Sequence, residues 1–343
     1  MKKIVIIGGG FCGTSCAREL EKEFNVTLID HKPYFEFTPS ILRTIIEPDH
    51  LKKIQAMHKD YLKKAKIVND EVLEISNSKV KTKDSSYDFD YLIITSGSTY
   101  NSPIKEEGLI PATRAKYLVE CHNKLVKSKK VLIIGGGLVG VELAAEICTH
   151  YKNKEISLVH SHEKLMERNH PKSQKYTEDF LKKHNVKLIF NEKVKSKKGS
   201  SIATEKGKKI KADISFMCVG IKPNFEFMKK NFSSSLTDKN QLKINEFCQL
   251  ENYKKIFAGG DITFVQEEKT AQAAEEYADV IIKNINNLEA DRGLITYTPK
   301  KRPMVISLGA KNGIFEYKNI VITGFIPAML KSFLEWKTMR KYR

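Results

Sequence analysis

Two glycine triads, each placed between a short apolar run and a stretch typical of a helix, are the residues of this chain with the clearest chemistry. In such a triad one glycine permits a tight turn, one lets the backbone approach a pyrophosphate, and one lets the helix pack closely on the strand. The helix N-terminus then offers free N–H groups to the phosphates. Two triads predict two bound dinucleotides and hydride transfer between them. The triads are Gly8, Gly10 and Gly13, and Gly135, Gly137 and Gly140.

The residue that ends the next predicted strand differs between the two copies. Asp30 ends the strand predicted over residues 25–30, where a carboxylate would bind an adenosine ribose. His160 ends the strand predicted over residues 155–160, where an enzyme specific for NAD would usually have Asp or Glu. Since no carboxylate there repels a 2′-phosphate, we expect use of both NADH and NADPH, with Arg168 as a further phosphate ligand. Ordinary loop histidines are the alternative interpretation.

The elements that must position these motifs follow one plan twice. Residues 1–110 contain a strand, the glycine turn, a helix and two further buried strands, and residues 111–225 repeat this order. Residues 226–293 are expected to return and complete the first domain, and residues 294–343 contain strands and a final basic helix. The predicted class is α/β, with two Rossmann-like βαβ dinucleotide-binding domains and a small C-terminal α+β segment.

Composition limits the class of protein further. The chain has 343 residues, which suits two or three domains. Its six cysteines are scattered without a CxxC motif, which is typical of a reducing cytosol. No apolar run reaches the roughly 18 residues of a membrane-spanning helix, and the N-terminus does not resemble a signal peptide. The formal net charge of +18 indicates either an ordinary solvated surface or attraction to an anionic one.

Three further segments carry a resemblance to a known family. They are TSGS at residues 95–98, CVGIKPN at residues 218–224, and IFAGGD ending at Asp261. With the two triads, they make the chain similar to the two-dinucleotide-binding flavoproteins, which include the pyridine nucleotide–disulfide oxidoreductases. The resemblance implies FAD at the first triad and NAD(P)H at the second. The implied ligands are Gly8, Gly10, Gly13, Asp30, Thr95, Gly97, Asp261 and Ala271 for FAD, and Gly135, Gly137, Gly140, His160 and Gly220 for NAD(P)H.

Two segments of the chain bear on the electron acceptor. Disulfide reductases of this superfamily carry redox cysteines after the first ribose-binding strand, but residues 31–44 contain none. The segment that starts at Lys269 resembles instead the helix of type II NADH dehydrogenases that borders the flavin ring and a quinone. Gln272 matches that motif, whereas Glu276 replaces its second glutamine. The resemblance implies a quinone acceptor, with Lys269 and Gln272 as catalytic candidates; an amphipathic helix with a small-residue face is the alternative.

Glu142, in the helix after the second triad, is the third catalytic candidate. In similar proteins a glutamate at this point lies under the nicotinamide, close to the flavin. A carboxylate that stabilises a helix N-terminus is the simpler interpretation, and the two are compatible.

The stretch at residues 327–343 is predicted to form a basic amphipathic helix that contains the only tryptophan of the chain. This composition is typical of an interfacial membrane anchor, whereas a helix packed on its own domain or on a second subunit is the alternative. We therefore expect a peripheral protein on the cytoplasmic face of an anionic membrane, with a homodimer left open. The apolar residues are Met329, Leu330, Phe333, Leu334, Trp336 and Met339, and the basic ones are Lys331, Lys337, Arg340, Lys341 and Arg343.

Taken with the resemblance, these features predict an FAD-dependent NAD(P)H:quinone oxidoreductase. It would resemble type II NADH dehydrogenases and apoptosis-inducing-factor-like quinone reductases, without proton pumping. A soluble NAD(P)H reductase of ferredoxin, rubredoxin or another small acidic carrier is the enzyme alternative. A basic flavoprotein that binds nucleic acid or other partners is the non-enzyme alternative. We expect no nucleic-acid partner, since basic residues are not interleaved with aromatic ones before the last helix, and we assign no metal site.

Overall fold

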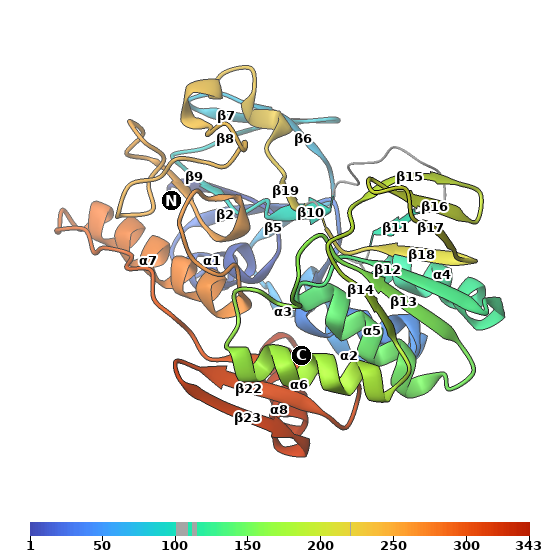
Figure 1. The fold of residues 1–343 in the computed structure, drawn as a ribbon. Helices are drawn as coiled ribbons and strands as arrows, with labels where there is room; N and C mark the ends of the chain where they lie inside the picture. The colour runs from blue at the N-terminus through green and yellow to red at the C-terminus, as the bar shows by residue number, and fades with distance from the viewer. Residues whose placement is uncertain (101–108, 112–114, 220) are drawn as a thin grey trace.

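The computed structural model describes residues 1–100, 109–111, 115–219 and 221–343. The first glycine triad begins directly after the central strand of a parallel five-stranded sheet. The strand order is β20-β9-β1-β2-β5. Strand β20 comes from a much later part of the chain and pairs with β9 in parallel (Figure 1). The strands are β1 (Lys3–Ile7), β2 (Asn25–Ile29), β5 (Lys66–Val68), β9 (Tyr91–Ile94) and β20 (Ile256–Ala258).

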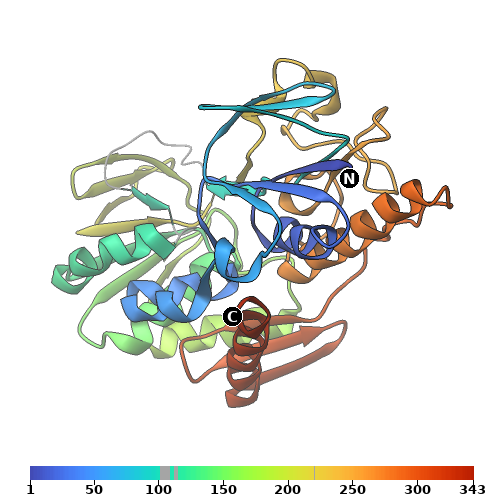
Figure 2. The same cartoon turned by 180° about the vertical axis from the view of Figure 1, so that it is seen from behind.

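Apolar residues cover both faces of this sheet, as expected for a parallel sheet between two layers. Along β1, Ile4 and Ile6 belong to one core cluster, whereas Val5 and Ile7 belong to another on the opposite face. The first cluster also includes α1 (Phe11–Leu20) and α7 (Ala271–Glu289). These two helices pack against each other and run side by side in both views (Figures 1 and 2).

A second parallel sheet of five strands repeats the plan around the second triad, in the order β11-β18-β12-β13-β14. Its central strand β12 alternates like β1, because Val131 and Ile133 face one core cluster and Leu132 and Ile134 face another. The strands are β11 (Leu109–Pro111), β12 (Lys130–Ile134), β13 (Glu155–Val159), β14 (Lys187–Ile189) and β18 (Ile214–Met217). The helices are α4 (Ala115–Lys127), α5 (Leu138–His150) and α6 (Pro171–Lys183).

Small antiparallel sheets complete both halves of the molecule. One of them pairs β10, which follows β9 of the first large sheet in the chain, with β19, which follows β18 of the second. The remaining elements of the two halves are β3 (Tyr34–Glu36) with β4 (Gln55–Met57), β6 (Val72–Ile75), β7 (Lys79–Thr82) and β8 (Ser86–Asp88), β10 (Ser98–Tyr100) with β19 (Ile221–Pro223), β15 (Val194–Lys198), β16 (Ser201–Thr204) and β17 (Lys209–Lys211), the 3-10 helix η1 (Thr38–Ile45), and the short helices α2 (Leu51–Ile54) and α3 (His58–Tyr61).

The C-terminal segment forms a three-stranded antiparallel sheet covered by one helix, which agrees with the α+β segment predicted for the end of the chain. It lies below both large sheets (red in Figures 1 and 2). The helix packs on its own sheet and on α2, so it contacts the first half of the chain as well. The elements are β21 (Met304–Ser307), β22 (Gly313–Tyr317), β23 (Ile320–Gly324) and α8 (Phe325–Met339).

The exact domain boundaries at residues 110, 225 and 293 stay a prediction. In the described part of the chain, none of the helices has the length and hydropathy needed to cross a bilayer.

Candidate functional site

The first glycine triad has the geometry that its spacing predicted. Gly8 adopts a φ of +99°, and a Cβ there would lie 2.4 Å from the carbonyl oxygen of Thr95. A Cβ at Gly13 would lie 1.9 Å from the carbonyl oxygen of Gly8, so only glycine lets α1 approach the turn. A Cβ at Gly10 would meet no described atom within 4 Å. The backbone is therefore open at the N-terminus of α1, which fits a pyrophosphate.

Asp30 lies directly beside this turn. Its Oδ2 accepts a hydrogen bond from the amide of Gly9 at 2.5 Å, and its Oδ1 accepts one from the amide of Lys32 at 2.8 Å. Burial raises the pKa of Asp30, but the ammonium of Lys32 and these amide donors outweigh it, so the pKa is lowered overall. The carboxylate is thus charged and oriented, as a ribose ligand has to be.

His58 supports the same corner, although no sequence motif pointed to it. A Cβ on Gly9 would meet Cε1 and Nε2 of its ring at 2.6 Å, so this edge of the imidazole lies against the turn. Its Nδ1 forms a hydrogen bond of 2.5 Å with the hydroxyl of Tyr61. Burial lowers the pKa of His58 to about 4, which keeps the ring neutral at physiological pH.

The segments around residues 95–98 and 218–224 meet, as corresponding segments of the two halves should. The Ser96 hydroxyl donates to the carbonyl of Asn224 at 2.7 Å, and the Asn224 amide donates back to the carbonyl of Ser96 at 2.7 Å. Thr95 donates to the carbonyl of Gly8 at 2.9 Å, which ties this junction to the first turn. Gly97 has a φ of +65°. Gly220, predicted to contact NAD(P)H, lies outside the described residues.

Asp261 and the start of α7 lie together on the flavin half. Asp261 accepts a hydrogen bond of 2.9 Å from the Ser98 hydroxyl. Lys269 donates to the carbonyl of Thr263 at 3.0 Å; burial lowers its pKa, which the nearby carboxylate of Asp261 partly offsets. Ala271 is the first residue of α7, and Gln272 beside it is exposed. The structure therefore brings Asp261, Lys269 and Ala271 into one region.

The second triad repeats the first. Gly135 has a φ of +112°, a Cβ at Gly140 would lie 1.8 Å from the carbonyl oxygen of Gly135, and Gly137 is open. His160 takes the place of Asp30, because its Nδ1 accepts a hydrogen bond of 3.1 Å from the amide of Gly136. Arg168, expected as a phosphate ligand, lies 3.8 Å from Glu268 with its side chain 84% exposed, and its role stays a prediction.

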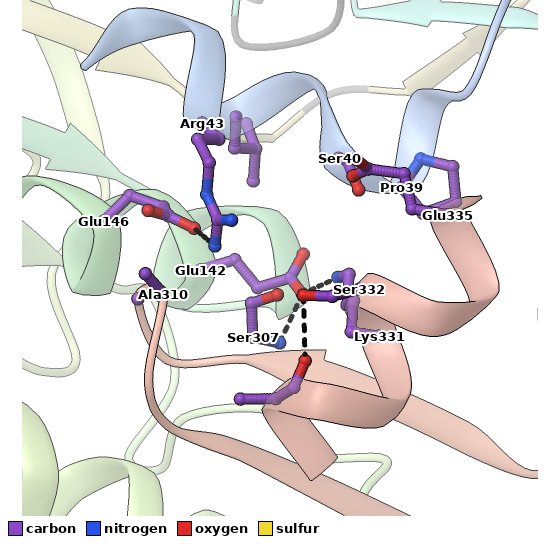
Figure 3. A pocket seen from close by; sticks show the side chains of 13 residues that line it. Pro39, Ser40, Arg43, Glu142, Glu146, Ser307, Ala310, Lys331, Ser332 and Glu335 are labelled. Atoms are coloured by element: carbon purple, nitrogen blue, oxygen red, sulfur yellow. Dashed lines mark hydrogen bonds and ion pairs between the residues drawn. The ribbon is translucent and has the colours of Figure 1, made fainter. Parts of the chain in front are cut away.

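Glu142 lies in a polar cavity of about 20 Å³ between η1, α5 and α8 (Figure 3). Its Oε1 accepts hydrogen bonds from the amide of Ser307 at 2.7 Å and from the ammonium of Lys331 at 2.6 Å. On the opposite wall, Arg43 contacts Glu146 at 3.2 Å. Each of these pairs joins residues from different parts of the chain, so the cavity exists only in the folded protein.

Comparison with known proteins assigns the fold and the enzyme class. The model of the pyridine nucleotide-disulphide oxidoreductase family matches residues 2–278. The chain belongs to this family. The predicted fold class, the two cofactors FAD and NAD(P)H, and the assignment as an oxidoreductase are thereby confirmed.

Relatives align over nearly the whole chain. Apoptosis-inducing factor homolog A of Dictyostelium discoideum is 32% identical, over 96% of this chain and 89% of the relative. Ferroptosis suppressor protein 1 of Mus musculus is 30% identical, over 98% and 96%. The sulfide:quinone oxidoreductase of Aquifex aeolicus superposes with a TM-score of 0.87 at 20% identity, covering 100% of this chain and 92% of that one. NDH2 of Plasmodium falciparum superposes with a TM-score of 0.85 at 15% identity, covering 99% and 98%. These two likenesses establish the fold.

The described cysteines form no disulfide. All six cysteines lie in the described part of the chain and are free. Cys12 and Cys16 are buried with Cys248 in the core between α1 and α7, as packing residues are, and burial raises the pKa of Cys12 and Cys248. The thiolate form needed for disulfide exchange is therefore disfavoured.

Glu276, which departs from the dehydrogenase motif, belongs to a charged cluster. Its carboxylate accepts from Arg302 at 2.8 Å and contacts Lys300 at 3.1 Å. Arg302 also contacts Glu267 at 2.6 Å. Burial raises the pKa of Glu276, but the hydrogen bonds from Arg302 and Lys300 lower it overall. The glutamate at this position thus holds the strand-forming C-terminal segment to α7.

Sequence reasoning missed the partners of the predicted residues. Lys331 was assigned to a membrane anchor, yet it contacts Glu142; Arg43 and Glu146 were not considered. Only the buried apolar context of Glu146 in α5 and the TPSILR stretch around Arg43 could have drawn attention to them.

Proposed function

We propose that the protein transfers electrons from NAD(P)H through FAD to a quinone at a membrane surface. The observation that carries this proposal is the pair of dinucleotide motifs joined through Ser96 and Asn224, with no accessible thiol pair among the described residues. When bound, FAD takes a hydride from NAD(P)H and returns two electrons to the acceptor. The protein's own residues bind, orient and shield the reactants.

Each cofactor would be held by groups of known geometry. Gly10 and the N-terminus of α1 would hold the FAD pyrophosphate, Asp30 its adenosine ribose and Asp261 its ribityl chain. Gly137 and the N-terminus of α5 would hold the NAD(P)H pyrophosphate. Thr270 caps α7, accepting from the amide of Ala273 at 3.2 Å, so the helix start is ordered beside Lys269. A helix N-terminus and a lysine together favour negative charge on a reduced flavin.

Glu142 and Lys331 would close the site on the side of α8. Both side chains are only 13% exposed, and their charges neutralise each other. The cavity they share is polar and small, so they would exclude bulk water from the reaction. Arg43 Nε and Glu146 Oε2 are buried there without a described hydrogen-bond partner, and a cavity of this volume would hold one water molecule between them.

Exposed apolar residues of α8 and β23 support docking of the protein to the cytoplasmic side of an anionic membrane. Seven large apolar side chains of β23 and α8 are between 43% and 69% exposed, and a group of exposed apolar side chains is typical of an interaction site. They are Ile320, Ile322, Phe325, Ile326, Met329, Phe333 and Trp336. We call this set the apolar face.

The basic residues of α8 and of the turn that follows it differ in their contacts. Lys341 contacts Glu275 at 2.9 Å, Arg343 donates to the carbonyl of Lys52 at 2.9 Å, and the largely buried Lys331 is bound to Glu142. Lys337 is exposed, and Arg340 lies over the Trp336 ring at 5.5 Å. These two cations border the apolar face, as expected of an interfacial helix.

The test is oxidation of NADH and of NADPH by the FAD-loaded protein with a water-soluble quinone. Turnover that depends on the quinone and changes little with salt is the expected result. Turnover only with ferredoxin or rubredoxin, falling steeply with salt, would instead support the soluble-reductase alternative. Salt-dependent DNA binding without turnover would support the non-enzyme alternative.

A further inference from the structure

Gly9 and Gly136 follow the first glycine of each triad, and the amide of each donates a hydrogen bond to a side chain after the second strand. The two dinucleotide motifs differ in the residue that accepts this bond. In the first motif Gly9 donates to the carboxylate of Asp30. In the second, Gly136 donates to Nδ1 of His160, which is only 7% exposed. An imidazole nitrogen that accepts this bond carries no proton, so in the neutral ring the proton lies on Nε2. His160 therefore presents a donor where Asp30 presents an acceptor.

That donor holds a carboxylate. Nε2 of His160 lies 2.8 Å from Oε1 of Glu167, which also lies 3.6 Å from Nε2 of His162. Glu167 belongs to the loop between β13 and α6. This loop is tied to the same glycine turn, because the amide of Met166 donates to the carbonyl of Gly136 at 2.9 Å. The position of Glu167 is thus set from both sides by the turn that would hold the pyrophosphate.

The carboxylate of Glu167 is also partly accessible to a ligand. It lines a cavity of about 550 Å³ beyond the C-terminal end of β13, together with Ser161, Asn169 and Asn191. Its side chain is 40% exposed there. In a Rossmann-like domain the adenosine ribose lies at this end of the second strand, where a carboxylate binds its 2′-hydroxyl.

We infer that Glu167, held by His160, is the residue that recognises the 2′-hydroxyl of NADH and disfavours the 2′-phosphate of NADPH. Two cations lie near this carboxylate, and each also has a carboxylate of its own: Lys164, which lines the same cavity, lies 4.0 Å from Glu163, and Arg168 lies 3.8 Å from Glu268. A preference for NADH differs from the mixed use expected from His160 and Arg168, because Glu167 supplies the carboxylate that position 160 lacks. It rests on the pyridine-nucleotide half of the proposed function and not on the quinone or the membrane.

The experiment is equilibrium titration of the FAD-loaded protein with NAD⁺ and NADP⁺, followed by calorimetry. The wild-type protein should bind NAD⁺ more tightly than NADP⁺. Glu167→Gln keeps an acceptor for His160 but removes the charge, so the ratio of the two Kd values should shift toward NADP⁺ by about tenfold. Glu163→Gln is the matched control, since it removes one charge from the same cavity without contact to His160, and it should shift the ratio less than about twofold.

A rescue variant separates recognition from loss of structure. His160→Asp in the Glu167→Gln background places a carboxylate where Asp30 lies in the first motif, and the preference for NAD⁺ should return. The inference fails if the wild-type protein binds both nucleotides equally, or if Glu163→Gln and Glu167→Gln shift the ratio to the same extent. If neither nucleotide binds, the proposed function itself is overturned.

Discussion

Lys331 of α8 forms an ion pair of 2.6 Å with Glu142 of α5, across 189 positions of sequence. The helix predicted to lie on a membrane therefore also forms one wall of the candidate site. On its inner side, Glu335 contacts His50 at 3.1 Å, and Met339 is buried. Deleting the chain from Pro327 would remove these contacts together with Met329, Phe333 and Trp336 of the apolar face, so single substitutions are needed to separate the two roles of α8.

Lys331→Ala should destabilise the protein by about 1–3 kcal/mol, because it leaves the largely buried carboxylate of Glu142 without its cation. The measurement is urea unfolding of the FAD-loaded protein. Lys331→Arg, which keeps the charge, should recover part of the loss. Lys337→Ala removes an exposed lysine from the same helix and should change the free energy of unfolding by less than about 0.5 kcal/mol. Equal effects of both alanine variants would contradict the role given to the ion pair.

The apolar face should control binding to vesicles. Phe333→Glu combined with Trp336→Glu should lower affinity for vesicles that contain anionic lipid by at least about tenfold, because two aromatic side chains no longer enter the interface. Turnover with a water-soluble quinone should persist. Leu73→Glu is the control, since Leu73 is a 50% exposed apolar residue on β6, remote from α8.

Light scattering of the same variants tests the alternative occupant of this face. A wild-type dimer that becomes monomeric in the Phe333→Glu, Trp336→Glu variant, with vesicle binding unchanged, would identify the face as a contact between two copies of the chain.

His58 should make the stability of the protein depend on pH. Burial lowers its pKa to about 4 in the folded state, whereas an unfolded histidine titrates near a pKa of about 6.5. Between these values the unfolded chain binds the extra proton. The contribution of His58 is therefore complete above about pH 6.5 and is lost as the pH falls toward 4, up to about 2–3 kcal/mol.

The measurement compares urea unfolding of the wild-type protein and of His58→Gln at pH 7 and pH 4.5. The variant should lose less stability over this interval, since its side chain does not titrate. The same loss in both proteins would show that other groups cause the pH dependence.

Tyr342 should couple the C-terminus to FAD binding. It is 1% exposed, and its ring lies 4.1 Å from that of Phe35 and 5.1 Å from that of Tyr61, which holds His58 behind the first glycine turn. Tyr342→Ala should cost about 3 kcal/mol of stability through the cavity it leaves, and FAD should be retained less well. Thermal unfolding and the visible absorption of the purified protein measure the two effects. Lys341→Ala, next to it but half-exposed, should leave both unchanged.

The sequence by itself determined the two dinucleotide motifs, the order of their strands and helices, and the family. These features depend on local requirements, because only glycine tolerates the backbone of Gly8 and the contact at Gly13, and alternating apolar residues such as Ile4 and Val5 form a strand buried on both faces. Asp30 ends the strand segment that follows the first triad, and Asp261 ends the IFAGGD segment, so both could be located from sequence motifs.

Only the tertiary structure decided which charges meet and which face of α8 is turned outward. An amphipathic pattern shows that a helix has two faces, but not that Lys331 turns inward to Glu142 while Phe333 stays exposed. Likewise, His160 and Arg168 predicted mixed nucleotide use from the sequence, whereas the folded loop brings Glu167 to 2.8 Å from His160. The physical reason is that an ion pair or a hydrogen bond depends on distance in space, and residues far apart or in an irregular loop acquire that distance only when the chain has packed.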